Sequence, residues 1–154
     1  AWEIVPGVSS LGAAAAALGR ELTVPEVSQS VILTRRAFRT PMPENESIRG
    51  FAAHRTTMAV FLSAARPRLL QEELLSGGYP PETPCAVVYR ASWPDEKVIE
   101  CPLGELAERV RGAGIKRQAL ILVGPALGAG GRRSRLYSPR FSHMFRRAEG
   151  EGDA

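Results

Sequence analysis

The sequence predicts an α/β domain in which helices flank a mixed β-sheet. Short uncharged apolar runs alternate along the chain with segments whose alanines or leucines recur at helical spacing. One pair of predicted strands, 86–89 and 97–101, is joined by a short turn that contains proline, which favours antiparallel pairing. The 154 residues, 44% hydrophobic and 23% charged, suffice for one ordinary domain with a sizeable core.

The first predicted unit is a strand, a tight turn and a helix. Residues 2–5 form a short apolar segment that Pro6-Gly7 ends, and Gly19 supplies a left-handed stop after an alanine-rich helix. Ser9 or Ser10 can cap this helix. Small hydroxyl residues at a helix N-terminus also let a ligand approach the backbone closely, so both interpretations remain open.

Further strands and helices follow in alternation. The other predicted strands are 31–34, 57–62, 86–89, 97–101 and 120–123. The other predicted helices are 46–53, a segment that begins at Pro67 and ends before Gly77-Gly78, and 103–110. Residues 57–62 carry no charge, so we expect both faces of this strand to be covered.

The two ends of the chain carry separate expectations. Residues 2–5 read as a buried strand with no partner strand or turn before it, so we expect the chain to be a portion of a longer protein. From Gly128 onward the sequence is rich in glycine and arginine and then acidic, which predicts a flexible terminus.

Several functional classes are disfavoured by composition. No apolar run approaches the length needed to cross a bilayer and no secretory leader opens the chain, so we expect a cytoplasmic protein. Cys85 and Cys101 lack the spacing of a metal or redox site and are predicted to be buried free thiols. His54 and His143 have no carboxylate or cysteine at ligand spacing, so we expect no metal site.

The net charge of +4 comes mostly from arginine, since only two of the 20 basic residues are lysines. A basic chain permits an anionic partner, and the planar fork of arginine suits carboxylates particularly well. One alternative is a nucleic-acid-binding module that uses arginines near the carboxyl terminus, although no recognition motif is present. These arginines are Arg132, Arg133, Arg135, Arg140, Arg146 and Arg147.

Small residues and prolines follow several predicted strands, at 8–10, 62–64, 89–91 and 123–126. In an open α/β sheet the carboxyl ends of strands form the crevice in which ligands bind. Small residues there leave room for a flat apolar group, although ordinary punctuation between strand and loop explains them as well. Methyl transfer from a sulfonium suits such a site because it needs alignment of donor and acceptor more than proton transfer.

Four sequence blocks, taken in order, resemble one known family: Val5 to Ser10, Val24 to Arg35, Arg39 to Pro43 and Tyr89 to Lys97, followed by Ile121 to Leu127. They are similar to the tetrapyrrole methylases, in particular to the precorrin-4 C-11-methyltransferases of cobalamin biosynthesis. The resemblance covers Trp2 to about Met144 and accounts for somewhat more than the carboxyl-terminal half of the usual family chain.

The resemblance implies two α/β domains with S-adenosylmethionine (SAM) in the cleft between them. Residues 1–22 then correspond to the last strand and helix of a missing amino-terminal domain, 23–127 to the carboxyl-terminal domain and 128–154 to a tail. The activity implied is SAM-dependent methyl transfer to carbon 11 of precorrin-4, giving precorrin-5, in a homodimer. Cobalt-precorrin-4 as substrate and a sister enzyme that methylates another ring carbon remain alternatives. The chain alone is expected to be inactive.

The resemblance, applied position by position, assigns one set of residues to the cofactor. A second set is assigned to the substrate because its members lie on loops beside the proposed cleft. The cofactor-binding positions are Ser9, Ser10, Leu62, Ala91, Pro125 and Ala126. Arginines on loops beside the proposed cleft, Arg35, Arg39 and Arg90, are predicted to pair with substrate carboxylates, the alternative being solvated surface side chains. No residue is a convincing general base, and the resemblance implies that the nucleophile is an electron-rich ring carbon of the substrate.

Overall fold

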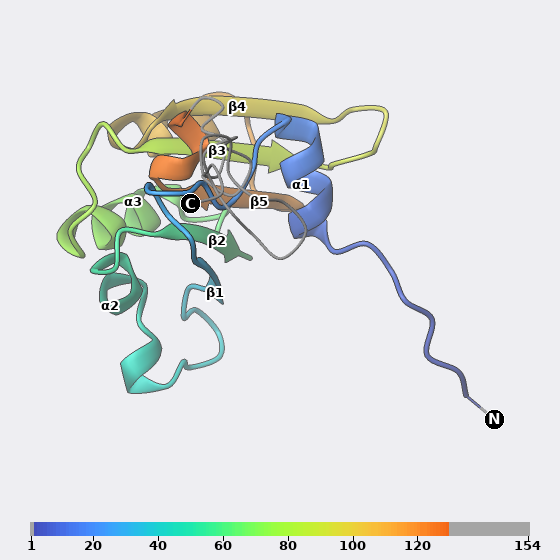
Figure 1. The fold of residues 1–154 in the computed structure, drawn as a ribbon, viewed down its shortest axis with the longest axis horizontal. Coiled ribbons are helices and arrows are strands. Elements are labelled where there is room, and N and C mark those ends of the chain that lie inside the picture. Colours follow the sequence, from blue (N-terminus) through green and yellow to red (C-terminus); the bar gives the residue numbers. More distant parts are fainter. Residues whose placement is uncertain (1, 130–154) are drawn as a thin grey trace, which may run out of the picture.

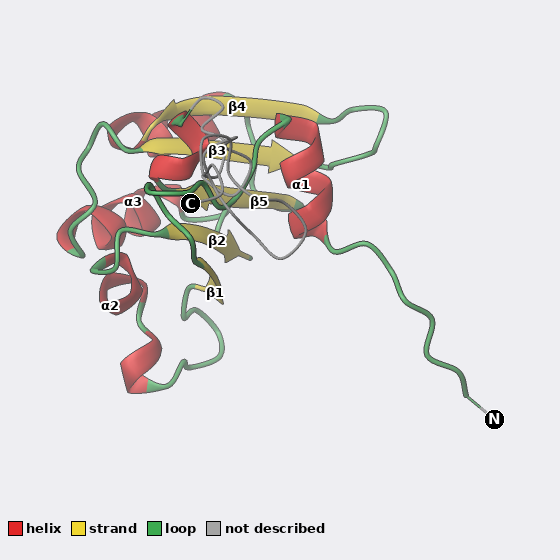
Figure 2. Cartoon of the chain, in the orientation of Figure 1, coloured by secondary structure: helices red, strands yellow, loops and turns green. Residues whose placement is uncertain are grey.

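The computed structural model describes residues 2–129, which form one mixed sheet with helices on both faces (Figures 1 and 2). The sheet has the order β1-β2-β5-β3-β4, so the expected fold class is confirmed. β1 runs parallel to β2, whereas every other neighbouring pair is antiparallel. The strands are β1 (Val31–Arg35), β2 (Thr57–Phe61), β3 (Pro84–Tyr89), β4 (Lys97–Pro102) and β5 (Ala119–Val123).

The helices lie close to the segments that the sequence predicts. They are α1 (Ser10–Leu18), α2 (Ile48–Ala52), α3 (Pro67–Ser76) and α4 (Leu106–Gly112), with 3-10 turns at Glu44–Glu46, Leu103–Glu105 and Pro125–Gly128. The helix predicted over 46–53 is shorter, because Ser47 has an extended backbone and its Oγ accepts a hydrogen bond from the Gly50 N–H at 3.0 Å. Ser47 is therefore the N-cap, and α2 begins after it.

The direction of β5 decides which loops share an edge of the sheet. β5 lies between β2 and β3 and runs antiparallel to both, so Ala119 is opposite Tyr89 while Val123 is opposite Cys85. The carboxyl ends of β1, β2 and β3 therefore meet the amino end of β5. The expectation that residues 123–126 join the same edge is wrong, because they follow β5 at its far end.

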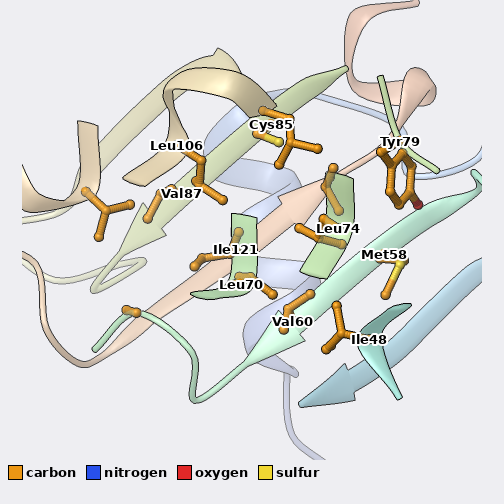
Figure 3. Packing of buried hydrophobic residues seen from close by; sticks show 14 of the residues in the cluster. Ile48, Met58, Val60, Leu70, Leu74, Tyr79, Cys85, Val87, Leu106 and Ile121 are labelled. Atoms are coloured by element: carbon orange, nitrogen blue, oxygen red, sulfur yellow. The ribbon is translucent and has the colours of Figure 1, made fainter. Parts of the chain in front are cut away.

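The larger core lies between one face of the sheet and helices α2, α3 and α4 (Figure 3). Alternate residues of β2 point to this face, so that Met58 and Val60 lie with Leu70 and Leu74 of α3, all four fully buried. Ile48 of α2 and Leu106 of α4 complete the same cluster. Burial of these side chains is the main stabilising contribution on this side.

The opposite face of the sheet packs against α1. Ala14 of α1 is buried with Ala59, Ala86 and Leu122, whose side chains point away from the larger core. Small side chains on both surfaces allow a helix to approach a sheet closely. Since Met58, Ala59 and Val60 are all fully buried, the prediction that β2 is covered on both faces is confirmed.

The segment before α1 differs from the prediction of a buried strand. Residues 2–9 form no strand, and Trp2, Ile4 and Val5 are 86%, 79% and 75% exposed. Figure 1 shows this segment running away from the sheet. A strand needs a neighbour that accepts its backbone hydrogen bonds, and the described residues place none beside this segment.

The two cysteines face one another across β3 and β4, where Cys85 is opposite Cys101. Both are buried and free, as expected from the sequence. Burial raises the pKa of both thiols, and the nearby Cys101 raises that of Cys85 further. These thiols are therefore protonated at neutral pH, and thiolate chemistry is disfavoured.

A second buried feature joins the amino ends of β1 and β2. The Tyr79 hydroxyl donates to the Thr56 carbonyl, and Thr56 Oγ1 donates to the Ser30 carbonyl at 2.5 Å. Ser28 Oγ lies 2.6 Å from Thr56 Oγ1 and accepts from the Thr57 N–H. Burial raises the pKa of Tyr79, so its hydroxyl remains a donor at neutral pH.

The expected tail over 128–154, with the arginines of the nucleic-acid alternative, lies beyond the described residues from position 130 on. Within residues 2–129 no helix is long and apolar enough to span a bilayer. The same residues contain no cluster of three side chains that could ligate a metal ion.

Candidate functional site

An open cavity of about 540 Å³ lies where the carboxyl ends of β2 and β3 meet the amino end of β5, beside α1. Its volume falls in the range of small-molecule sites. Its walls come from four segments that are distant in sequence. The lining residues are Val8, Ser10, Ala13, Ala14, Phe61, Leu62, Ala64, Val88, Arg90, Ala91, Ser92, Trp93, Lys116, Arg117, Gln118, Ala119 and Leu120.

The amino-terminal turn of α1 forms one wall. Ser9 is the N-cap, and its Oγ accepts a hydrogen bond from the Leu11 N–H at 3.2 Å, which matches the capping alternative for this residue. Ser10 lines the cavity instead, followed by Ala13 and Ala14. These small side chains leave the cavity open toward the helix.

Strained backbone gathers around the same cavity. Leu62, Arg90, Ser92 and Gln118 all line it and have φ values of 53°, 49°, 69° and 56°. Left-handed backbone is unfavourable for residues with a Cβ and persists where the surrounding structure enforces it, often at ligand sites. The clustering of these four residues marks the cavity as the candidate site.

Leu62, directly after β2, is an apolar residue that is exposed to solvent. Its side chain is 84% exposed, whereas Ser63 and Ala64 beside it are buried. Ser63 Oγ donates to the Phe61 carbonyl at 2.9 Å, which fixes the turn that displays Leu62. An exposed leucine beside a cavity offers apolar surface for a ligand to cover.

The turn after β3 is held by Arg90. Its Nη1 lies 2.5 Å from Asp95 Oδ2, its Nε donates to Gln118 Oε1 at 3.0 Å, and its guanidinium lies 5.0 Å from the Trp93 ring centroid. The Arg90 N–H also donates to the Gln118 carbonyl. Arg90 thus ties the two loops that flank Ala91, and its charge is already paired with a carboxylate.

Arg35 and Arg39, the other two predicted substrate ligands, lie outside this cavity. Arg35 ends β1, and its guanidinium donates to the carbonyls of Thr40 and Pro41 at 3.3 and 3.0 Å. Arg39 is exposed on the loop that these bonds hold, 5.9 Å from the Phe38 ring centroid. Phe61 lines both the cavity and the hollow that contains Arg35, so the two regions are adjacent.

The structure brings together three of the predicted cofactor residues, Ser10, Leu62 and Ala91. It does not bring Pro125 and Ala126 to this cavity, because β5 carries them to the other end of the sheet. In their place the residues before β5, 116–118, form the wall. No motif in the sequence pointed to these residues, and only the polar run between Gly114 and the strand could have drawn attention to them.

The cavity contains little acid–base chemistry. Its ionisable lining side chains are Arg90, Lys116 and Arg117, and it has no histidine, cysteine or carboxylate among the described lining residues. Arginine and lysine are protonated at neutral pH and are poor general bases. The arrangement can bind and orient a ligand but supplies no base.

Comparison with known proteins identifies the family. The model for tetrapyrrole (corrin/porphyrin) methylases matches residues 1–107. The chain belongs to the tetrapyrrole methylase family. A cobalt-precorrin-4 C(11)-methyltransferase of Methanocaldococcus jannaschii is 52% identical over 147 residues, 95% of this chain and 57% of that protein. A precorrin-4 C(11)-methyltransferase of Pseudomonas aeruginosa is 48% identical, with 96% of this chain and 59% of that protein covered.

Solved structures of tetrapyrrole methylases share this fold. The X-ray structure of a cobalt precorrin-4 methyltransferase, a cobalamin biosynthetic enzyme, matches with a TM-score of 0.79 and 47% identity over 81% of this chain and 52% of that one. A uroporphyrin-III C-methyl transferase from Thermus thermophilus complexed with S-adenosylhomocysteine matches with a TM-score of 0.65 and 30% identity over 82% and 53%. The chain spans slightly more than half the length of these tetrapyrrole methylases.

Proposed function

We propose that the chain is the carboxyl-terminal portion of a SAM-dependent methyltransferase that acts on carbon 11 of precorrin-4 or its cobalt form. The observation that carries this proposal is the meeting of Ser10, Leu62 and Ala91 at one cavity. These positions were assigned to the cofactor by the family resemblance, and they come from three different elements. The relatives' names, at 48–52% identity, support the choice of reaction.

The chain's own residues suit a bound SAM molecule. Ser10 and Ala91 leave room at the wall, Leu62 supplies exposed apolar surface, and backbone groups at the strand ends can hydrogen-bond a heterocycle. SAM, when bound, supplies a methyl group already activated by the sulfonium. The residues at the cavity therefore need only to bind and orient, which agrees with the scarcity of acid–base groups there.

The substrate in this proposal is the precorrin-4 skeleton, with or without cobalt. Relatives with either name are similar to this chain to almost the same degree, so both forms belong to the proposal. The alternative is methylation of another ring carbon, as in a related tetrapyrrole methylase. Analysis of the product distinguishes the two reactions. Ser9 as a cofactor contact, a homodimer and a cytoplasmic location stay predictions. Pro125 and Ala126 do not line the cavity proposed for the cofactor, so their predicted contact with it is not part of this proposal.

The cavity assignment is tested by calorimetric titration of the complete protein with S-adenosylhomocysteine. Ser10→Trp and Ala91→Trp fill the cavity and should each weaken binding at least tenfold, or about 1.4 kcal/mol. Ala53→Trp, at an exposed position after α2, is the matched control and should bind as the unmodified protein does. Equal affinity in all variants would show that the ligand binds elsewhere.

The reaction is tested with precorrin-4, its cobalt form and SAM that carries a labelled methyl group. A single label at carbon 11, located by NMR, is expected from the complete protein. A label at another carbon would replace the proposed reaction with the sister activity. The 154-residue chain alone should bind the cofactor weakly and give no product, and micromolar affinity would contradict its assignment as one wall of the site.

A further inference from the structure

Phe38 lies exposed on the loop after β1, against two guanidinium groups. Arg66 Cζ is 4.0 Å from the centroid of its ring, and Arg39 Cζ is 5.9 Å from the same centroid. Phe38 is 56% exposed, so it is not part of the core. An arginine that packs on an aromatic face loses little of its hydrogen-bonding capacity, because its N–H donors lie at the edge of the guanidinium plane.

These guanidinium groups form no ion pair within residues 2–129. Neighbouring arginines are paired, since Arg36 binds Glu73 at 2.8 Å and Arg68 binds Glu72 at 3.0 Å. Neither Arg39 nor Arg66 forms an ion pair with a described carboxylate. Their charge is therefore available to an anionic ligand.

Two further contacts hold this positive region in place. Arg35 donates to the carbonyls of Thr40 and Pro41, which fixes the loop that carries Phe38 and Arg39 without neutralising the Arg35 charge. Glu46 lines the hollow beside Arg35 but forms no ion pair with it. The ends of β1 and β2 thus present three arginines that form no ion pair with a described carboxylate.

A short, rigid connection joins this region to the candidate cofactor cavity. The Arg66 N–H donates to the Ser63 carbonyl at 3.2 Å, and Ser63 Oγ donates to the Phe61 carbonyl. Phe61, Leu62 and Ala64 line the cavity, so Arg66 lies a single turn beyond the cavity wall. A ligand that extends out of the cavity over Leu62 therefore leaves it beside the turn that carries Arg66.

We propose that Arg66, held against Phe38 and assisted by Arg39, binds a carboxylate side chain of the tetrapyrrole and so determines how the macrocycle is placed. This inference rests on the proposed function and adds Arg66 and Phe38 to the predicted substrate residues. A guanidinium edge can hold a carboxylate through two parallel hydrogen bonds, which fixes orientation as well as position.

The test uses the complete protein and steady-state kinetics with precorrin-4. Arg66→Gln should raise KM about tenfold with little change in kcat, because one charge-assisted anchor is lost. Arg66→Lys should restore only part of the affinity, since lysine lacks the fork. Phe38→Leu should raise KM by a smaller factor, roughly threefold, because the guanidinium loses its stacking surface. Arg68→Gln, two residues further along in the first turn of α3 and paired with Glu72, is the matched control and should behave as the unmodified protein.

Two accompanying measurements separate this inference from the proposed function. Arg66→Gln should retain the affinity for S-adenosylhomocysteine and the melting temperature of the unmodified protein. An unchanged KM in an otherwise active protein would overturn the role of Arg66 and leave the proposed function standing. A lowered melting temperature or cofactor affinity would also overturn it, by showing a structural role. An unmodified protein that neither binds S-adenosylhomocysteine nor methylates precorrin-4 would instead refute the proposed function.

Discussion

The Arg90 guanidinium and the Asp95 carboxylate are joined at 2.5 Å across the turn between β3 and β4. Arg90 was predicted to bind a substrate carboxylate, but in the structure its charge is paired with Asp95. A paired arginine that also binds Gln118 and lies against Trp93 holds the two loops beside Ala91 in place. We therefore expect its main effect on the cofactor to be exerted through the positions of these loops.

The loop assignment predicts the effect of Asp95→Asn. Loss of the carboxylate charge should weaken S-adenosylhomocysteine binding roughly threefold to tenfold in the complete protein, because the Arg90 loop is less well held. The free energy of unfolding should change by less than about 1 kcal/mol, since the pair is partly exposed. Calorimetry and urea denaturation provide the two values. An unaltered affinity would show that the pair has no part in shaping the cavity.

Leu62→Gly should separate stability from binding. Glycine removes the strain of a left-handed leucine, and little burial is lost because Leu62 is 84% exposed, so stability should stay within about 1 kcal/mol. Affinity for S-adenosylhomocysteine should fall about tenfold, because the apolar surface that covers the ligand is gone. Leu33→Ala is the control, because Leu33 on β1 is also an exposed leucine, at 56%, and does not line the cavity. It should leave the affinity for S-adenosylhomocysteine unchanged. A large loss of stability in the glycine variant would contradict this account of Leu62.

The core between α3 and the sheet predicts a contrast between two leucines of one helix. Leu74 is fully buried, so Leu74→Ala should lower the free energy of unfolding by about 2–5 kcal/mol. Leu69 is 39% exposed on the other face, and Leu69→Ala should cost less than about 1 kcal/mol. Urea denaturation of the purified chain measures both. Similar losses for the two variants would mean that α3 packs with a different face inward.

Stability should decrease at alkaline pH because three buried groups, Cys85, Cys101 and Tyr79, resist ionisation. Folding raises the pKa of Cys85 above its ordinary value of 9.0 and that of Tyr79 above 10.0. The unfolded chain therefore loses these protons at lower pH than the folded chain. The contribution of these groups to the free energy of unfolding is fully present below pH 9. It is lost as pH rises, first through ionisation of Cys85 and Cys101 and then through ionisation of Tyr79.

Thermal melts between pH 7 and 11 test this dependence. Cys85→Ala should be less stable at every pH, because the smaller side chain leaves a cavity. Its melting temperature should nevertheless depend less steeply on pH between pH 9 and 10. Tyr79→Phe should flatten the dependence above pH 10. Identical slopes in the variants and in the unmodified chain would show that other groups cause the loss. Alkylation by iodoacetamide at pH 8 should likewise be slow at Cys85 unless the chain is unfolded.

Local sequence signals predicted most elements of the fold. The apolar runs of β2 and β5, the leucine spacing of α3 and the capping by Ser9 with Gly19 depend on neighbouring residues, and the structure has all of them. The strand predicted over 2–5 fails because pairing depends on a partner, which apolar composition cannot supply. The helix predicted over 103–110 begins later, at Leu106, because residues 103–105 form a 3-10 turn, which is common at the start of a helix.

The candidate site was predicted less completely than the fold. Ser10, Leu62 and Ala91 meet as expected, whereas Pro125 and Ala126 do not, because the direction of β5 depends on tertiary contacts. The left-handed backbone of Arg90 and Gln118 follows from the contact between two loops, which no local pattern encodes. The stacking of Arg66 on Phe38 likewise joins residues that only the parallel pairing of β1 and β2 brings together.

The central place of β5 has a consequence for how the chain acquires its structure. Until residues 119–123 have left the ribosome, β1 with β2 and β3 with β4 are two separate ribbons, each with an unpaired inner edge. The last-made strand of the described sheet is the one that joins them, so folding is expected to be late and to depend on contacts distant along the chain. A nascent polypeptide stalled before Ala119 should expose both edges and be prone to self-association.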